Sequence, residues 1–70
     1  MGAKLAEIKP IPNPETEQFC AEMAHRYTRG ENPEVLLKKF NNWVAERHLV
    51  RWEVWQMRDR VSYLIKCSVQ

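Results

Sequence analysis

Two copies of one short motif, Asn-Pro-Glu, constrain the fold more than any other feature of this 70-residue chain. They stand at residues 13–15 and 32–34. Asn offers a side-chain oxygen to the unpaired amides of a first helical turn, and Pro at the first helical position forfeits no hydrogen bond. Glu then complements the positive end of the helix dipole. Each motif therefore predicts the start of a helix.

After each motif, apolar residues recur at the spacing of a helix. The first helix is predicted over 14–29, and Gly30 follows it as a left-handed C-terminal cap. Its buried face would hold Phe19, Cys20, Met23 and Tyr27. The second helix is predicted over 33–47, with a buried stripe of Leu36, Leu37, Phe40, Trp43 and Val44. Because only residues 30–32 connect them, the two helices should pack as neighbours.

Residues 49–69 allow two interpretations. They contain no Gly or Pro, which favours a third helix with an apolar face of Val50, Val54, Met57, Val61 and Leu64. That helix would project Trp52, Trp55 and Tyr63 among charged residues, a poor use of three large aromatic side chains.

The other interpretation is a β-hairpin with a loop over 57–60. It places Val50, Trp52, Val54, Tyr63, Ile65 and Cys67 on one side. The abundance of Val, Trp, Tyr and Ile favours strands, although Arg58-Asp59 is a poor tight turn. We therefore predict an α+β fold, two N-capped helices followed by a C-terminal β-hairpin, with a three-helix all-α domain as the alternative. Residues 1–12 would form an N-terminal arm or short strand, and 13–70 a single compact domain.

Composition narrows the class of protein. The chain is 44% apolar, which argues against global disorder, and its net charge is only +2. That surplus permits a nucleic-acid surface without requiring one. Two cysteines are too few for a secreted disulfide scaffold, and charges and prolines interrupt the first 14 residues. We therefore expect a cytoplasmic protein that has no membrane segment.

No pattern of reactive side chains predicts catalysis. Cys20, His25, His48 and Cys67 are possible zinc ligands, but their spacing fits no metal motif. Cys67 could approach His48 in the hairpin, yet it would face the core, where a thiol is inert. With only two glycines, the chain has no phosphate-binding loop. We predict no enzyme activity, catalytic residue, metal, cofactor or small-molecule substrate.

Binding of another protein is the function that the sequence favours. Three Trp fall within thirteen positions, and Trp beside Arg is typical of interface hot spots. We predict an adaptor or regulator that binds another protein, or a second copy of itself, through the C-terminal aromatic segment. The predicted partner-binding residues are Arg51, Trp52, Trp55, Leu64 and Lys66.

The alternative is a minimal winged helix-turn-helix DNA-binding protein. The helix at 33–47 would read base edges, and the hairpin tip at 57–60 would contact phosphates. The residues predicted for this role are Lys38, Lys39, Asn41, Asn42 and Arg47 on the helix and Arg58 and Arg60 at the tip.

Overall fold

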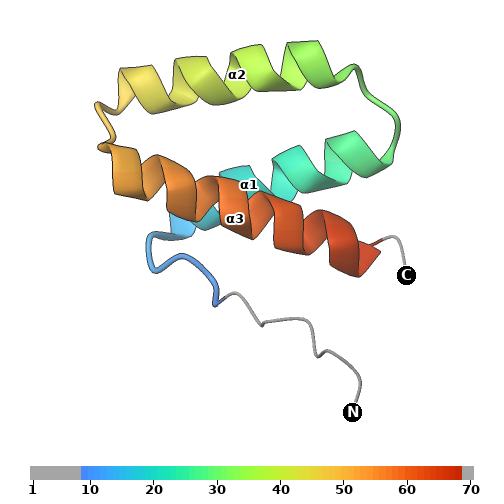
Figure 1. Cartoon of the computed structure of the whole chain (residues 1–70), viewed down its shortest axis with the longest axis horizontal. Helices are drawn as coiled ribbons and strands as arrows, with labels where there is room; N and C mark the ends of the chain where they lie inside the picture. The colour runs from blue at the N-terminus through green and yellow to red at the C-terminus, as the bar shows by residue number, and fades with distance from the viewer. Residues whose placement is uncertain (1–8, 69–70) are drawn as a thin grey trace.

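The computed structural model describes residues 9–68, and these form three helices (Figure 1). The helices are α1 (Pro14–Thr28), α2 (Pro33–Glu46) and α3 (Arg51–Ser68). Within residues 9–68 there is no strand, so the predicted α+β fold with a C-terminal hairpin is wrong. The fold is the three-helix alternative. The prediction for the N-terminal arm falls mainly on residues 1–8, which lie outside the described residues.

Both Asn-Pro-Glu motifs begin helices, as predicted. The side-chain oxygen of Asn13 accepts hydrogen bonds from the amides of Glu15 at 2.9 Å and Thr16 at 3.3 Å. The Asn32 oxygen accepts one from the Glu34 amide at 2.9 Å. Two amides that the helix cannot pair internally are thus satisfied in α1, and one in α2.

Both helices also end in the same type of cap. After α1, Gly30 adopts a left-handed conformation with φ 92°, and the Glu31 amide donates to the Arg26 carbonyl at 3.1 Å. After α2, His48 takes the left-handed position with φ 52°, and the Leu49 amide donates to the Val44 carbonyl at 3.3 Å. These six-to-one bonds are those of the Schellman motif. Sequence predicted the glycine cap but not the histidine.

The start of α3 explains why sequence patterns concealed this helix. Val50 stands at its N-cap position and has no side-chain acceptor for the first-turn amides. Instead, the Glu53 carboxylate accepts a hydrogen bond from the Val50 amide at 3.0 Å. This is the returning half of a capping box. The usual marker of a helix start is therefore missing although the start itself is stabilised.

The faces of α3 explain why this segment forms a helix and not a hairpin. Met57 is 1% exposed, and Val54 and Val61 pack against the core. Trp52 and Trp55 remain 64% and 58% exposed. With no Gly or Pro in eighteen residues, the helix pairs its backbone internally and buries one apolar stripe. This combination outweighs the burial of Trp52 and Tyr63 that a hairpin would have given, and the hairpin would also have needed a poor Arg-Asp turn.

The core is small and draws on all three helices and the residues before them. Its buried members are Ile11, Cys20, Phe40 and Met57. Phe19 stacks on Trp43 with ring centroids 4.4 Å apart, joining α1 to α2. Three residues of the predicted apolar faces are exposed instead: Leu37 at 60%, Val50 at 51% and Tyr27 at 47%.

A buried ion pair closes the side of the molecule where α1 meets α3. Arg60, only 8% exposed, donates from Nη2 to Glu17 Oε2 at 2.7 Å. The Ile11 amide donates to Glu17 Oε1 at 3.0 Å. The hydrogen bond from Arg60 lowers the pKa of Glu17, outweighing the opposite effect of burial. One carboxylate therefore connects α3, α1 and the segment before α1.

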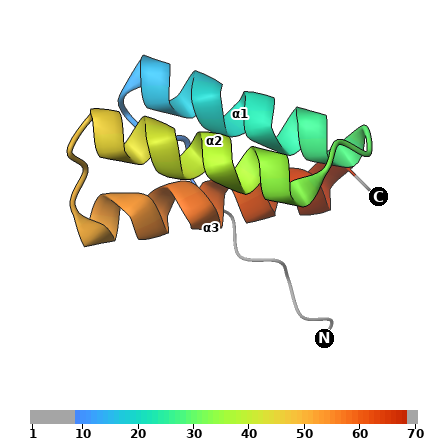
Figure 2. The same ribbon diagram turned by 90° about the horizontal axis from the view of Figure 1, so that it is seen from above.

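The three helices pack unequally. The backbone of α1 lies close to that of α3 and, over a shorter stretch, to that of α2, whereas the α2 and α3 backbones are further apart. All three helices still contribute side chains to one core, including Phe40 from α2 and Met57 from α3. Figure 2 shows α2 lying over the other two helices, joined to α3 by the short turn at residues 47–50. Within residues 9–68, no helix has the length and hydropathy needed to span a membrane.

Candidate partner-binding groove

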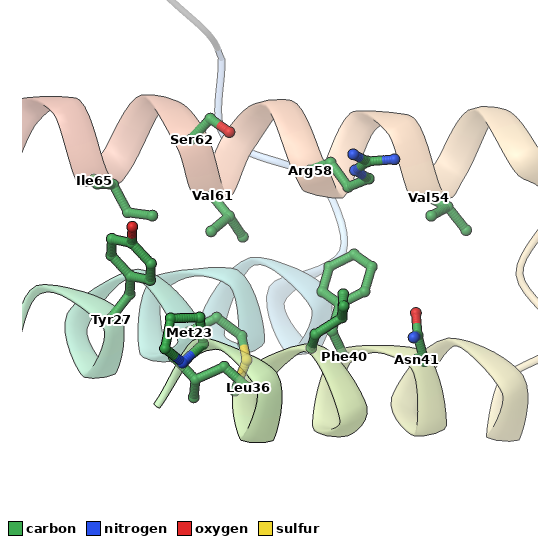
Figure 3. Close-up of a pocket in the computed structure, with 12 residues that line it drawn as sticks. Met23, Tyr27, Leu36, Phe40, Asn41, Val54, Arg58, Val61, Ser62 and Ile65 are labelled. Carbon is green, nitrogen blue, oxygen red and sulfur yellow. The ribbon is translucent and has the colours of Figure 1, made fainter. Parts of the chain in front are cut away.

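Because α2 and α3 diverge, a groove of about 600 Å³ runs between them. We call it the α2–α3 groove. Met23 and Tyr27 of α1 contribute to its lining, and Figure 3 shows them between the two walls. The α2 wall consists of Pro33, Leu36, Leu37, Phe40 and Asn41, and the α3 wall of Val54, Arg58, Val61, Ser62 and Ile65. Most of these side chains are apolar.

Exposure differs between the depth and the rim of the groove. Leu36 is 6% exposed and Phe40 is 9% exposed, so buried core residues form the floor of the groove. Leu37, at 60%, presents most of its surface to solvent. In Figure 3 the Tyr27 hydroxyl points across the groove toward Ile65. A bound molecule could therefore cover apolar surface without disturbing the residues beneath it.

A few polar groups stand among these apolar side chains. Arg58 lies along the α3 wall between Val54 and Val61, and the Asn41 amide extends from α2 (Figure 3). Within residues 9–68, Arg58 forms no salt bridge. An apolar groove with a small number of polar groups is the usual composition of a binding site.

Trp55 adjoins this groove. Together with Asp59 it lines a shallow hollow whose other residues, Arg58 and Ser62, also line the groove. Trp52 is three residues earlier on α3, about 60° further round the helix axis and away from the groove. Of the two exposed tryptophans, Trp55 is the one positioned to contact a molecule in the groove.

The other residues predicted for partner binding separate. Arg51 and Lys66 are exposed, as the prediction requires. Leu64 is half-buried and stands two turns after Met57, on the core side of α3. The hairpin would have placed Leu64 beside Trp55, but in the helix these residues are on opposite sides.

The residues predicted to bind nucleic acid do not form one surface. Asn41 lines the α2–α3 groove, whereas Lys39 and Asn42 line a different hollow, between α1 and α2. Lys38 is exposed. Because the residues predicted to form the wing belong to α3, Arg58 and Arg60 lie within a helix and not at a hairpin tip.

Two of the arginines in this set already hold carboxylates. Arg60 binds Glu17. Arg47 lies 3.3 Å from a Glu15 oxygen, and its guanidinium carbon is 3.9 Å from the Trp43 ring centroid. The winged-helix geometry is therefore wrong, and nucleic-acid binding itself stays a prediction.

The cysteines and histidines do not assemble into a reactive site. Cys20 is fully buried, and burial raises the pKa of its thiol to about 12. Cys67 is exposed rather than in the core. It lies sixteen residues beyond the first residue of α3, roughly 24 Å along the helix from the end nearest His48. Within residues 9–68, no three His, Cys, Asp or Glu side chains could hold one metal ion.

The chain was compared with protein families, curated proteins and solved structures. No family model, curated protein or solved structure matches the chain.

Sequence reasoning missed the groove because it treated Leu37 as part of the buried stripe. Leu36 and Leu37 are consecutive, so their side chains diverge by about 100° on a helix. Only one of them can point to the centre of a three-helix core. An apolar residue at the edge of the stripe was the available signal.

Proposed function

We propose that this chain is a non-catalytic binding module that holds another protein in the α2–α3 groove. The observation that carries the proposal is the exposure of large apolar side chains around one apolar groove. Tyr27, Leu37 and Trp55 are 47%, 60% and 58% exposed. Single exposed apolar residues are ordinary, but several of them gathered around one apolar groove are typical of interaction sites.

The composition of the rim supports a protein as the bound molecule. Trp55 and Arg58 contribute to one hollow, and Trp and Arg are the residue types most enriched at interface hot spots. Truncation of such a residue commonly costs more than 1 kcal/mol of binding free energy. An adaptor or regulator acting in the cytoplasm fits this proposal, since a reducing compartment would keep the exposed Cys67 thiol unpaired.

Site-specific photo-crosslinking in the cells that make the protein tests the proposal. A benzophenone amino acid is placed at position 37 or 55, with the exposed position 25 on α1 as the control. We expect one crosslinked partner common to positions 37 and 55 and absent from 25. Trp55→Ala should weaken the crosslink from position 37. Equal crosslinking from all three positions would contradict the proposal.

A further inference from the structure

The walls of the α2–α3 groove favour a helical segment as its occupant. Both walls are helices, whose interior backbone amides and carbonyls are paired within the helix. Within residues 9–68 there is no strand edge to which an extended peptide could add. A helix placed between α2 and α3 would pack its side chains against both, as an amphipathic helix does in a groove.

The length of the groove defines the segment. Its α3 wall extends from Val54 to Ile65, twelve residues that span about 16 Å along the helix axis. A helix of about three turns covers that distance. It needs apolar side chains at spacings of three and four to contact Leu37 and Val61 on the facing walls.

Charge decides between the possible helical partners. Arg58 lines the groove, and Lys38, which does not line it, is exposed on α2 about 60° round the helix axis from the lining residue Asn41. Neither cation forms a salt bridge within residues 9–68. By contrast, Arg47 and Arg60, which do not line the groove, each hold a carboxylate. One cation on the α3 wall and one beside the α2 rim are therefore available to an acidic partner.

The same charges disfavour a second copy of this chain. In a two-fold dimer the same patch meets itself, so two surfaces that each carry a surplus of cations would be brought together. Like charges placed together across an interface oppose association. Two acids accompany these cations: Glu34 stands one turn before Lys38, and Asp59 follows Arg58. Arg51, which is exposed on the same face of α3 as Arg58, adds a third cation. The surface around the groove therefore keeps a net positive charge.

We infer that the groove binds an acidic amphipathic helix of a partner protein, with its apolar face on the groove floor and its carboxylates beside Arg58 and Lys38. This inference rests on the proposed function. It adds the chemical class of the ligand, because apolar contact supplies affinity while the cations select the sign of charge.

Two synthetic helical peptides of about 14 residues test the inference. They share one apolar face and carry either Glu or Lys at the flanking positions. Binding to the full chain is followed by amide chemical shifts at low ionic strength. We expect the acidic peptide to bind about tenfold more tightly than the basic one, with shifts centred on the lining residues of α2 and α3.

Charge-reversal variants supply the matched control. Arg58→Glu and Lys38→Glu should each reduce the preference for the acidic peptide, and together they should reverse it. Lys39→Glu changes the same charge at the next position of α2, but its side chain lines the hollow toward α1. This variant should keep the preference of the wild type. Circular dichroism confirms that each variant remains helical.

The possible failures are distinguishable. Equal binding of both peptides would overturn the acidic ligand while leaving the protein-binding function in place. Binding of neither peptide, with crosslinking from positions 37 and 55 retained, would overturn the helical occupant alone. Loss of both peptide binding and crosslinking would contradict the proposed function as well. Crosslinks between two copies of the chain would overturn the acidic partner, because they would show that the groove binds a second copy.

Discussion

Replacing Glu17 by Gln removes the negative charge that faces Arg60 between α1 and α3. Arg60 is 8% exposed, and the Glu17 side chain is 24% exposed. Removing one partner of a fully buried pair typically costs 3–5 kcal/mol, because the remaining charge stays desolvated. Partial exposure of Glu17, and the acceptor oxygen that Gln retains for Arg60 or Ile11, reduce the expected cost to about 2–3 kcal/mol. A chain of this size has a total stability of only about 4–10 kcal/mol.

Urea unfolding at neutral pH, followed by circular dichroism, measures this change. The matched control is Glu15→Gln, because Glu15 also binds an arginine, Arg47, but its side chain is 67% exposed. That variant should change the free energy of unfolding by no more than about 0.5 kcal/mol. A double-mutant cycle with Arg60→Met should yield a coupling of at least about 1 kcal/mol. Equal effects of Glu17→Gln and Glu15→Gln would refute the reasoning.

The pH dependence of stability follows from the same carboxylate. Its pKa is lowered in the folded chain, chiefly by the hydrogen bond from Arg60. The unfolded chain therefore takes up this proton at higher pH than the folded chain does. The contribution of Glu17 is complete above the ordinary glutamate pKa of about 4.3 and is lost as pH falls through the lowered value. The stability difference between the wild type and Glu17→Gln should therefore shrink below about pH 4 in urea titrations. A difference independent of pH would contradict this.

Three further substitutions test the caps and faces of the helices, each by its effect on the urea midpoint. His48→Gly should stabilise by roughly 0.5–1 kcal/mol because it relieves a left-handed residue, whereas His25→Gly within α1 should destabilise by about 1 kcal/mol. Val50→Ser should stabilise by up to about 1 kcal/mol by adding the missing N-cap oxygen; no change would show that the first-turn amides of α3 gain nothing from a side-chain acceptor. Trp55→Ala should stay within about 0.5 kcal/mol of wild type, whereas Leu64→Ala should cost about 1–2 kcal/mol; the reverse order would place Trp55 in the core.

The parts of the fold that sequence predicted correctly are those with local chemical markers. Asn13 and Asn32 act on amides two or three residues away, so the start of each helix is encoded within one turn. Gly30 is similar, because its left-handed conformation closes α1 through neighbouring carbonyls. Such interactions do not depend on how the rest of the chain packs.

The third helix was mispredicted because its decisive interactions are distant in sequence. Arg60 was treated as a phosphate-binding residue at a hairpin tip, but it pairs with Glu17, 43 positions away. No local pattern identifies that partner. The Val, Trp, Tyr and Ile content of the segment favoured strands, and the hairpin would have placed Trp52 on the core side, but Trp52 is 64% exposed on the helix.

The candidate site was predictable only in part for the same reason. Sequence selected Trp55 as an interface residue, and its exposure beside a groove agrees with that role without testing it. The groove itself depends on the separation of α2 from α3, which follows from how both helices pack against α1. Leu37 becomes a rim residue only once that geometry is known.

The same geometry links binding to stability. Within the described residues, Met57 and Cys20 are the largest side chains that are fully buried, so the core has little reserve. A helix in the α2–α3 groove would contact both of the helices whose backbones lie furthest apart. At a concentration one hundred times its dissociation constant, a ligand that binds only the folded chain stabilises it by about 2.7 kcal/mol. That gain is a quarter or more of the roughly 4–10 kcal/mol of total stability expected for so small a domain. An occupied groove would therefore complete the packing of α2, and the exposed apolar rim is the part of this small fold where added contacts would stabilise it most.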